Sequence, residues 1–415
     1  MKLTKTIGPG LLFASTAIGT SHLVLSTRAG AHYGLIFIWI ILGALLLKYP
    51  FYEFGTRYPI ATGKSLVYGY KQQGGIALGL FTLIICINMF AVTGAVGAVS
   101  AGLLSTLIAA PLGIHTMVAL ILIVTVALLF FGGYAFLDGF IKILSVILFL
   151  SVTMAFVAVL IKGPTEQVSD FTAPVVFDSA GLALLISLIG WMPAGMEAST
   201  MNSIWVVEKW KDTNHRPTIK EGLLDFKLGY GFTVLLAIMF LVIGSYTVYG
   251  SNQLLEGNAN QFSTALIKVF TANLGSWAFP IIGIAAFGTI YGTLITILDA
   301  FARSLANCIL ELRPTVNNRQ KANKLYYKSI LPVIAIGGFL LFYLSASSMV
   351  KVLEFATVLS FITAPFIAYF NLRAICSAEV PKSYQPAVRL IYLAYLGLGM
   401  NVIFAVFYLY HYFTS

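Results

Sequence analysis

Two short groups of small and polar residues lie inside hydrophobic stretches of this sequence. The first is Gly19-Thr20-Ser21-His22, near the middle of an apolar stretch that extends from Gly8 to Gly34. The second is Gly190-Trp191-Met192-Pro193-Ala194-Gly195, about 170 residues later. Glycine and hydroxyl residues loosen a helical hydrogen-bond ladder. Backbone groups freed within a bilayer are tolerated where they line a cavity or a buried site, so the two groups predict a substrate site between two interrupted helices.

Glu197 is the acidic residue closest to either interruption, two residues beyond the second group. Charged side chains inside a membrane are costly and are usually functional. One interpretation places Glu197 on the substrate or coupling path. The other pairs it with a neighbour such as His22 or Arg28, and the sequence leaves both open.

The other polar candidates also have two interpretations each. His22 can be a ligand, a proton carrier or a buried hydrogen-bonding group. Met192 can line the site or fill the core. Asn88 and Asn202 can line the site or join helices by hydrogen bonds. Asp299 has Arg303 one turn along the same helix, which predicts an ion pair between them.

A metal site here would depend on His22 and Met192, on the hydroxyls of Thr20 and Ser21, and on carbonyls freed near Gly19 and Gly190. A dehydrated divalent cation needs anionic or strongly polar oxygen and nitrogen ligands. Without a carboxylate this set is weak, so a largely hydrated ion is the form of substrate that it favours.

The opposite substrate charge is equally compatible with interrupted helices. The free N–H groups at the N-terminus of a half-helix attract anionic groups such as a carboxylate. Residues 19–21, Gly-Thr-Ser, offer such a concave backbone. A small organic or anionic solute, such as an amino acid, is therefore the alternative to a metal.

The composition restricts the class of protein. The chain has 415 residues, of which 59% are hydrophobic and 10% charged, and its mean hydropathy is +0.91. Soluble globular chains carry roughly 25% charged residues. The net charge of +10 is spread over short loops, which indicates membrane topology and not a nucleic-acid partner. No nucleophile elbow, zinc-protease motif, P-loop or dinucleotide fingerprint is present, so we expect neither an enzyme nor a cofactor.

Hydropathy predicts an all-α polytopic protein with eleven transmembrane helices in one domain covering 1–415. The predicted spans are 8–31, 34–56, 75–108, 114–132, 135–161, 179–207, 228–250, 276–306, 329–346, 350–371 and 386–412, with a short amphipathic helix at 262–274. A cytoplasmic N-terminus places 21 of the 25 lysines and arginines on the inner side and the C-terminus outside.

The interruptions fall in the first and sixth spans, so the repeating unit is five spans long. An odd number of spans inverts the second copy relative to the first. The sequence thus predicts inverted repeats at about 8–162 and 179–371, with an extra helix at about 386–412.

Several short motifs, taken together, resemble the Nramp (SLC11-type) divalent-metal transporters. They are Gly8-Pro9-Gly10, Ala29-Gly30-Ala31-His32-Tyr33-Gly34, Ala61-Thr62-Gly63-Lys64-Ser65-Leu66, Met192-Pro193, and Val358-Leu359-Ser360 with Pro365-Phe366. The resemblance implies a leucine-transporter-like 5+5 inverted repeat with discontinuous helices 1 and 6, working by alternating access.

The departures from the family pattern concern the metal ligands. The family's Asp-Pro-Gly-Asn corresponds here to Gly19-Thr20-Ser21-His22, and its Met-Pro-His-Asn corresponds to residues 192–195, Met-Pro-Ala-Gly. The acidic pair associated with proton movement falls on Asn88 and Ala91. The resemblance therefore implies a divergent member without the usual metal-binding residues or proton route.

We accordingly expect a secondary-active carrier of a divalent cation, Mg²⁺ or a transition metal, in the plasma membrane. The candidate substrate-binding residues are Gly19, Thr20, Ser21, His22, Met192, Ala194, Gly195, Glu197 and Asn88, with His22 and Met192 as candidate metal ligands. The expected partners are the lipid bilayer and an ion or small-molecule substrate, without nucleic acid, and the carrier is expected to function as a monomer.

Overall fold

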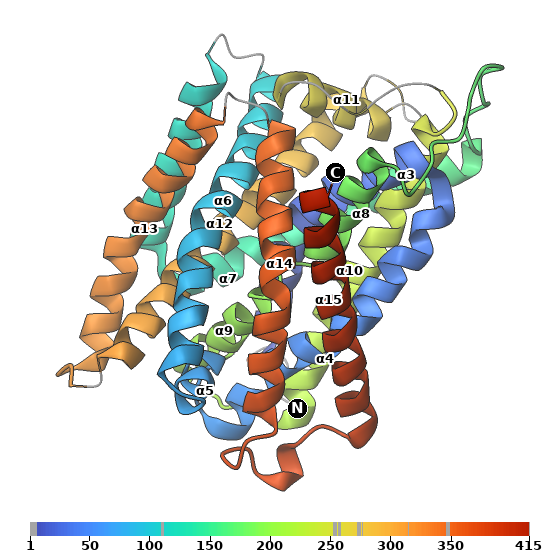
Figure 1. The fold of residues 1–415 in the computed structure, drawn as a ribbon. Helices are drawn as coiled ribbons and strands as arrows, with labels where there is room; N and C mark the ends of the chain where they lie inside the picture. The colour runs from blue at the N-terminus through green and yellow to red at the C-terminus, as the bar shows by residue number, and fades with distance from the viewer. Residues whose placement is uncertain are drawn as a thin grey trace.

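The protein is a bundle of helices, and most of the long helices run roughly along one common direction (Figure 1). The computed structural model describes residues 6–108, 112–251, 255, 259–271, 275, 277–313, 315–345 and 349–414. The helices of this part are α2 (Pro9–Ala17), η1 (Ile18–Ser26), α3 (Thr27–Tyr33), η2 (Gly34–Ile36), α4 (Phe37–Thr62), α5 (Leu66–Gln72), α6 (Gly75–Ile108), α7 (Ile114–Lys162), α8 (Ser179–Trp191), α9 (Ala198–Thr213), α10 (Ile219–Val248), α11 (Ala259–Thr271), α12 (Ala278–Leu312), α13 (Arg319–Leu344), α14 (Met349–Ile375), η3 (Lys382–Tyr384) and α15 (Val388–Thr414). The all-α prediction is confirmed.

Every predicted span corresponds to helical structure. Among the described residues, eight helical runs are long and apolar enough to cross a membrane. One run, Pro9–Thr62, contains the first two predicted spans, and α7 contains the fourth and fifth. The halves of α7 meet at Gly133, whose φ of 67° suits glycine. The sixth span is divided between α8 and α9.

The predicted amphipathic helix is α11, Ala259–Thr271. Its apolar side chains Phe262, Leu266 and Ile267 are fully buried. Residues 272–274 of the predicted helix lie outside the described residues, as do the predicted span ends at 276 and 346.

The two interruptions have different forms. In the first span, Ile18–Ser26 forms a π-helix between two α-helical segments, so the chain widens there without leaving the helix. π-Helical turns occur often at functional sites. In the sixth span the helix stops at Trp191 and restarts at Ala198, with Met192 in an extended conformation. Figure 1 shows α8 towards the end of the bundle where α11 lies, and α9 towards the end where α5 lies.

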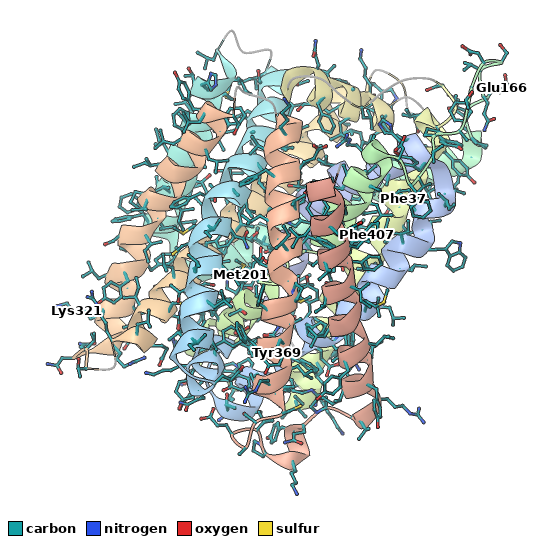
Figure 2. All side chains as sticks on the ribbon, in the orientation of Figure 1. Phe37, Glu166, Met201, Lys321, Tyr369 and Phe407 are labelled. Atoms are coloured by element: carbon teal, nitrogen blue, oxygen red, sulfur yellow. The ribbon has the colours of Figure 1, made fainter. Side chains whose placement is uncertain are left out.

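Figure 2 shows where side chains lie in the bundle. Glu166 and Lys321 lie at opposite ends, whereas Met201, which is 2% exposed, lies at mid-height inside it. Large apolar side chains such as Trp39, 76% exposed, cover the outside of the bundle. Such an apolar exterior is expected where lipid surrounds the helices.

Glycines allow the first span to approach α10 closely. A Cβ atom on Gly229 would lie 2.1 Å from the carbonyl oxygen of Gly10, and one on Gly10 would lie 2.2 Å from that of Asp225. At the same crossing, the Asp225 carboxylate accepts hydrogen bonds from the backbone N–H groups of Gly8 (3.1 Å) and Gly10 (2.7 Å). The Gly8-Pro9-Gly10 motif therefore allows the start of the first helix to pack closely against α10.

Gly229→Ala is expected to destabilise the protein by about 1–3 kcal/mol, because the added methyl group forces α10 away from the first helix. Thermal unfolding in detergent measures the effect. Gly231→Ala is the matched control on the same helix, since a Cβ atom there meets nothing within 4 Å. Equal melting temperatures for the two variants would contradict this explanation of the motif.

Candidate functional site

A small cavity of about 40 Å³ lies where the two interrupted spans meet. This is room for a few water molecules, since one water needs roughly 10–15 Å³ on the same measure. Its lining residues come from the first span, from α6, from α8 and α9 with the segment between them, and from α12. They are Thr16, Ala17, Thr20, Ser21, Val92, Val96, Trp191, Ala194, Gly195, Glu197, Ala198, Met201, Thr293, Ile297 and Phe301.

Glu197 supplies the carboxylate of this cavity. It is 4% exposed and directly precedes the first residue of α9, where the positive end of the helix dipole favours a negative charge. Its Oε1 accepts a hydrogen bond from the Ser360 hydroxyl (3.3 Å), and Ser360 in turn accepts one from the Trp191 indole N–H (3.0 Å). Its Oε2 is buried and has no hydrogen-bond partner.

Thr20 provides a second buried polar atom without a partner. Its hydroxyl oxygen is buried and has no hydrogen-bond partner in the protein, and Thr20 lines the same cavity as Glu197. Buried polar groups nearly always have partners, and leaving one unpaired costs about 1–3 kcal/mol. The two atoms together therefore mark a place for a polar ligand or for water.

Lys48 of α4 lies at the gap in the sixth span. Its side chain is buried, and its ammonium donates to the carbonyl oxygens of Ile189 (2.6 Å), Gly190 (2.9 Å) and Ala194 (3.5 Å). The first two carbonyls belong to the last turn of α8, where a cation is favoured by the helix dipole. The two halves of the broken helix thus have a cation at the end of α8 and a carboxylate at the start of α9.

Tyr52, one turn beyond Lys48, completes the support of the gap. Its hydroxyl donates to the carbonyl oxygens of Ala194 (2.6 Å) and Gly195 (3.2 Å). The carbonyls of the segment between α8 and α9 are therefore engaged by α4. The carbonyls near Gly190 that the sequence offered as substrate ligands are therefore held by protein side chains.

His22 does not line the cavity. Its Nε2 lies 3.0 Å from the Thr233 carbonyl oxygen of α10, and its Nδ1 lies 2.6 Å from the Ser21 hydroxyl and 2.9 Å from the Ala17 carbonyl oxygen. Both ring nitrogens are thus engaged by protein groups. This arrangement favours the hydrogen-bonding interpretation of His22, and its role as a metal ligand stays a prediction.

Ser21 links the two interruptions directly. Its hydroxyl contacts the Ala17 carbonyl oxygen, one turn back on its own helix, and lies 3.0 Å from the Pro193 carbonyl oxygen across the site. Gly19 packs on α12, because a Cβ atom there would lie 2.0 Å from the Thr293 hydroxyl oxygen. The small residues of the first group therefore bring the first span, α12 and the segment between α8 and α9 together around the cavity.

The remaining candidates lie beside the cavity and not in its lining. Met192 is fully buried, and the thioether that lines the cavity belongs to Met201, one turn after Glu197 on α9. Asn88 is fully buried; its Nδ2 lies 3.5 Å from the Thr363 hydroxyl, and its Oδ1 has no partner. Asn202 donates to the Thr56 hydroxyl (2.7 Å), in keeping with a structural role.

The structure separates Glu197 from the partners proposed for it. The Arg28 guanidinium faces another carboxylate instead, with its Nη1 atom 4.0 Å from Glu354 Oε1. Asp299 and Arg303 form the expected ion pair (2.8 Å), and Asp299 also accepts hydrogen bonds from Trp205 (2.9 Å) and Tyr327 (2.8 Å). The sequence therefore predicted the Asp299 pair correctly.

The donor set of the cavity is poor in charged ligands. Within the described ranges, no group of three or more histidine, cysteine, aspartate or glutamate side chains is placed to hold a metal ion. Glu197 is the carboxylate that lines the cavity, with the Thr20 hydroxyl and the Met201 thioether as neutral donors. Such a set suits an ion that keeps part of its water shell, or a small polar solute.

Sequence reasoning missed Lys48, Met201 and Thr293. Lys48 lies within the second predicted span, and the sequence does not show that its side chain is buried by α4 against the gap. The position of Met201 could have been predicted, because it lies four residues after Glu197 and residues at that spacing share a helix face.

Comparisons with known proteins agree over nearly the whole chain. The family model described as "Natural resistance-associated macrophage protein-like" (Nramp) matches residues 10–411. The uncharacterised protein PM0681 of Pasteurella multocida (strain Pm70) is 30% identical over 397 residues, covering 94% of this chain and 89% of its own.

Two solved structures share the fold. A manganese transporter of Eremococcus coleocola, in complex with an aromatic bis-isothiourea substituted compound, superposes with a TM-score of 0.74 at 13% identity, covering 98% of this chain and 86% of its own. MhsT in complex with L-phenylalanine gives a TM-score of 0.64 at 14% identity, covering 95% and 98%. At these identities the matches show the shared architecture alone.

Proposed function

Because the chain belongs to the Nramp family, we propose that it is a secondary-active carrier that moves a divalent metal cation across the membrane. The substrate class is Mg²⁺ or a transition metal, bound with part of its water shell. The manganese transporter that shares the fold supports a metal as substrate. The carrier works as a monomer in the plasma membrane, with its N-terminus in the cytoplasm and its C-terminus outside.

The observation that carries this proposal is the pair of unpartnered oxygens in the cavity, Glu197 Oε2 and Thr20 Oγ1. A hydrated cation can pair with the carboxylate and donate water hydrogen bonds to the hydroxyl. Mg²⁺ in particular keeps several waters and is commonly bound through one or two carboxylates. Glu197 thus takes over the anionic role that the family gives to the aspartate of the first span.

Alternating access follows from the two interruptions. The first span with η1, and α8 with α9, are the segments that move against the remaining helices. Asn88 and Ala91 stand where the family has its acidic pair, so transport proceeds without the family's usual proton route. If addition of the substrate acidifies the lumen of proteoliposomes that contain the carrier, protons move with the substrate, and this part of the proposal is contradicted.

Calorimetric titration of the purified carrier with Mg²⁺ and with Mn²⁺ tests the proposal. We expect saturable binding to the wild type and an affinity more than about tenfold lower in Glu197→Gln, because the variant lacks the carboxylate that lines the cavity. Glu166→Gln is the control, since Glu166 lies exposed at one end of the bundle (Figure 2). Absence of binding heat from any divalent cation would overturn the proposal.

A small organic or anionic solute is the second candidate. The Lys48 ammonium beside the gap offsets the charge of Glu197, and MhsT, bound to L-phenylalanine, has the same fold. This alternative predicts thermal stabilisation by an amino acid or an organic anion, because a ligand that binds only the native state raises its stability. A broad screen of metabolites without a thermal shift would count against it.

A further inference from the structure

The ammonium of Lys48 is buried and is satisfied by backbone carbonyl oxygens. Burying an ammonium inside a membrane protein is costly, and such groups pair with a carboxylate or with backbone carbonyl oxygens. Among the described residues, none of the ion pairs within 4.0 Å includes Lys48. Its contacts are the Ile189, Gly190 and Ala194 carbonyl oxygens, two in the last turn of α8 and one in the gap.

Converging backbone carbonyls at the end of a broken helix are ligands for a small monovalent cation. Hard cations bind oxygen atoms, and the C-terminal ends of half-helices in carriers coordinate Na⁺ through freed carbonyls. We propose that Lys48 is a tethered cation that fills such a place permanently. The side chain then performs the structural task of a bound ion, and the helix break needs no dissolved Na⁺ or K⁺.

This inference concerns the support of the gap and does not depend on which substrate the carrier moves. Lys48 is held by the carbonyl side of the gap, whereas the unpartnered oxygens of Thr20 and Glu197 face the cavity. Three features of this position are those of a cation site: carbonyl ligands, burial and the C-terminus of a helix. A neutral donor in the same position would satisfy the hydrogen bonds but not the dipole.

A second cavity gives access to the same ammonium from the lipid-facing side. It has a volume of about 610 Å³ and is lined mainly by apolar side chains of α4, α8 and α15, among them Leu47, Ile189, Phe404 and Phe407, together with Lys48. Truncation of Lys48 would extend this space to the three carbonyl oxygens. A small alkylammonium ion can therefore reach the vacated place.

Lys48→Ala tests the proposal through thermal unfolding in NaCl and in choline chloride at equal ionic strength. We expect the wild type to melt at the same temperature in both salts. The variant should melt about 5 °C or more lower in choline chloride and recover in NaCl or in ethylammonium chloride. Lys209→Ala is the matched control, because Lys209 is equally buried but pairs with the Asp138 carboxylate (2.9 Å).

Two results would overturn the inference. The first is a Lys48→Ala protein that is destabilised and regains nothing from Na⁺ or ethylammonium. The second is a wild type that Na⁺ itself stabilises over choline. Lys48→Gln is the variant to use if Lys48→Ala does not fold. We expect Na⁺ to raise the melting temperature of Lys48→Gln relative to choline chloride. A Lys48→Gln protein as stable as the wild type in choline chloride would show that neutral donors suffice, and would overturn the inference.

Discussion

Asp299→Ala is expected to lower the free energy of unfolding by about 3–5 kcal/mol, because it leaves the buried Arg303 guanidinium without its closest partner. The Asp299 side chain is fully buried, and its carboxylate accepts hydrogen bonds from Arg303, Trp205 and Tyr327. These residues belong to α9, α12 and α13, so one carboxylate joins three helices. Thermal unfolding followed by size-exclusion chromatography in detergent measures the loss.

Glu311→Ala is the control for the Asp299 prediction. Glu311 also has two cationic partners, Lys71 (3.2 Å) and Arg319, but these are 31% and 43% exposed. Exposed ion pairs contribute about 0–1 kcal/mol, so this variant should melt close to the wild type. Similar losses in both variants would mean that burial does not set the strength of the Asp299 network.

A double variant separates the charge from the packing. Asp299→Leu with Arg303→Met removes both members of the pair and leaves apolar side chains of comparable size. We expect the double variant to be more stable than Asp299→Ala, since no unpaired charge stays buried. If the double variant is less stable than the single one, the hydrogen bonds to Trp205 and Tyr327 carry the effect instead.

The spans and their interruptions followed from the sequence because they depend on local composition. An apolar run long enough to cross a bilayer can be recognised from the sequence alone, and so can a Gly- and Pro-rich segment within such a run. The form of the first interruption did not follow. The choice between an extended break and the π-helix at Ile18–Ser26 depends on contacts that Gly19 and Ser21 make with α12 and with Pro193.

The composition of the cavity was predicted in part. Thr20, Ser21, Ala194, Gly195 and Glu197 line it, since each belongs to an interruption or lies within two residues of one, and their role in substrate binding stays a prediction. Met201 and Thr293 also line the cavity and come from regular helices, as does Lys48 beside the gap. The direction in which each of these side chains points depends on how its helix is rotated about its own axis. Rotation is set by packing between spans far apart in the sequence, which a single sequence does not display.

Lys48→Met is expected to raise the affinity for a divalent cation at Glu197 by more than tenfold. The substitution removes a positive charge from the gap while keeping a side chain of similar length. A unit charge several ångströms from a dication, at an effective dielectric constant of about 20, changes the binding free energy of the dication by a few kcal/mol. Calorimetric titration with Mg²⁺ or Mn²⁺ measures the change.

The matched controls test whether the gain in affinity arises at Glu197. Lys209→Met makes the same substitution at a lysine held by Asp138, and its affinity should equal that of the wild type. Adding Glu197→Gln to Lys48→Met should abolish the gain, because the carboxylate that the lysine offsets is then absent. An affinity that is unchanged or lower in Lys48→Met, in protein that is still folded, would show that the ammonium supports α8 without acting on the substrate.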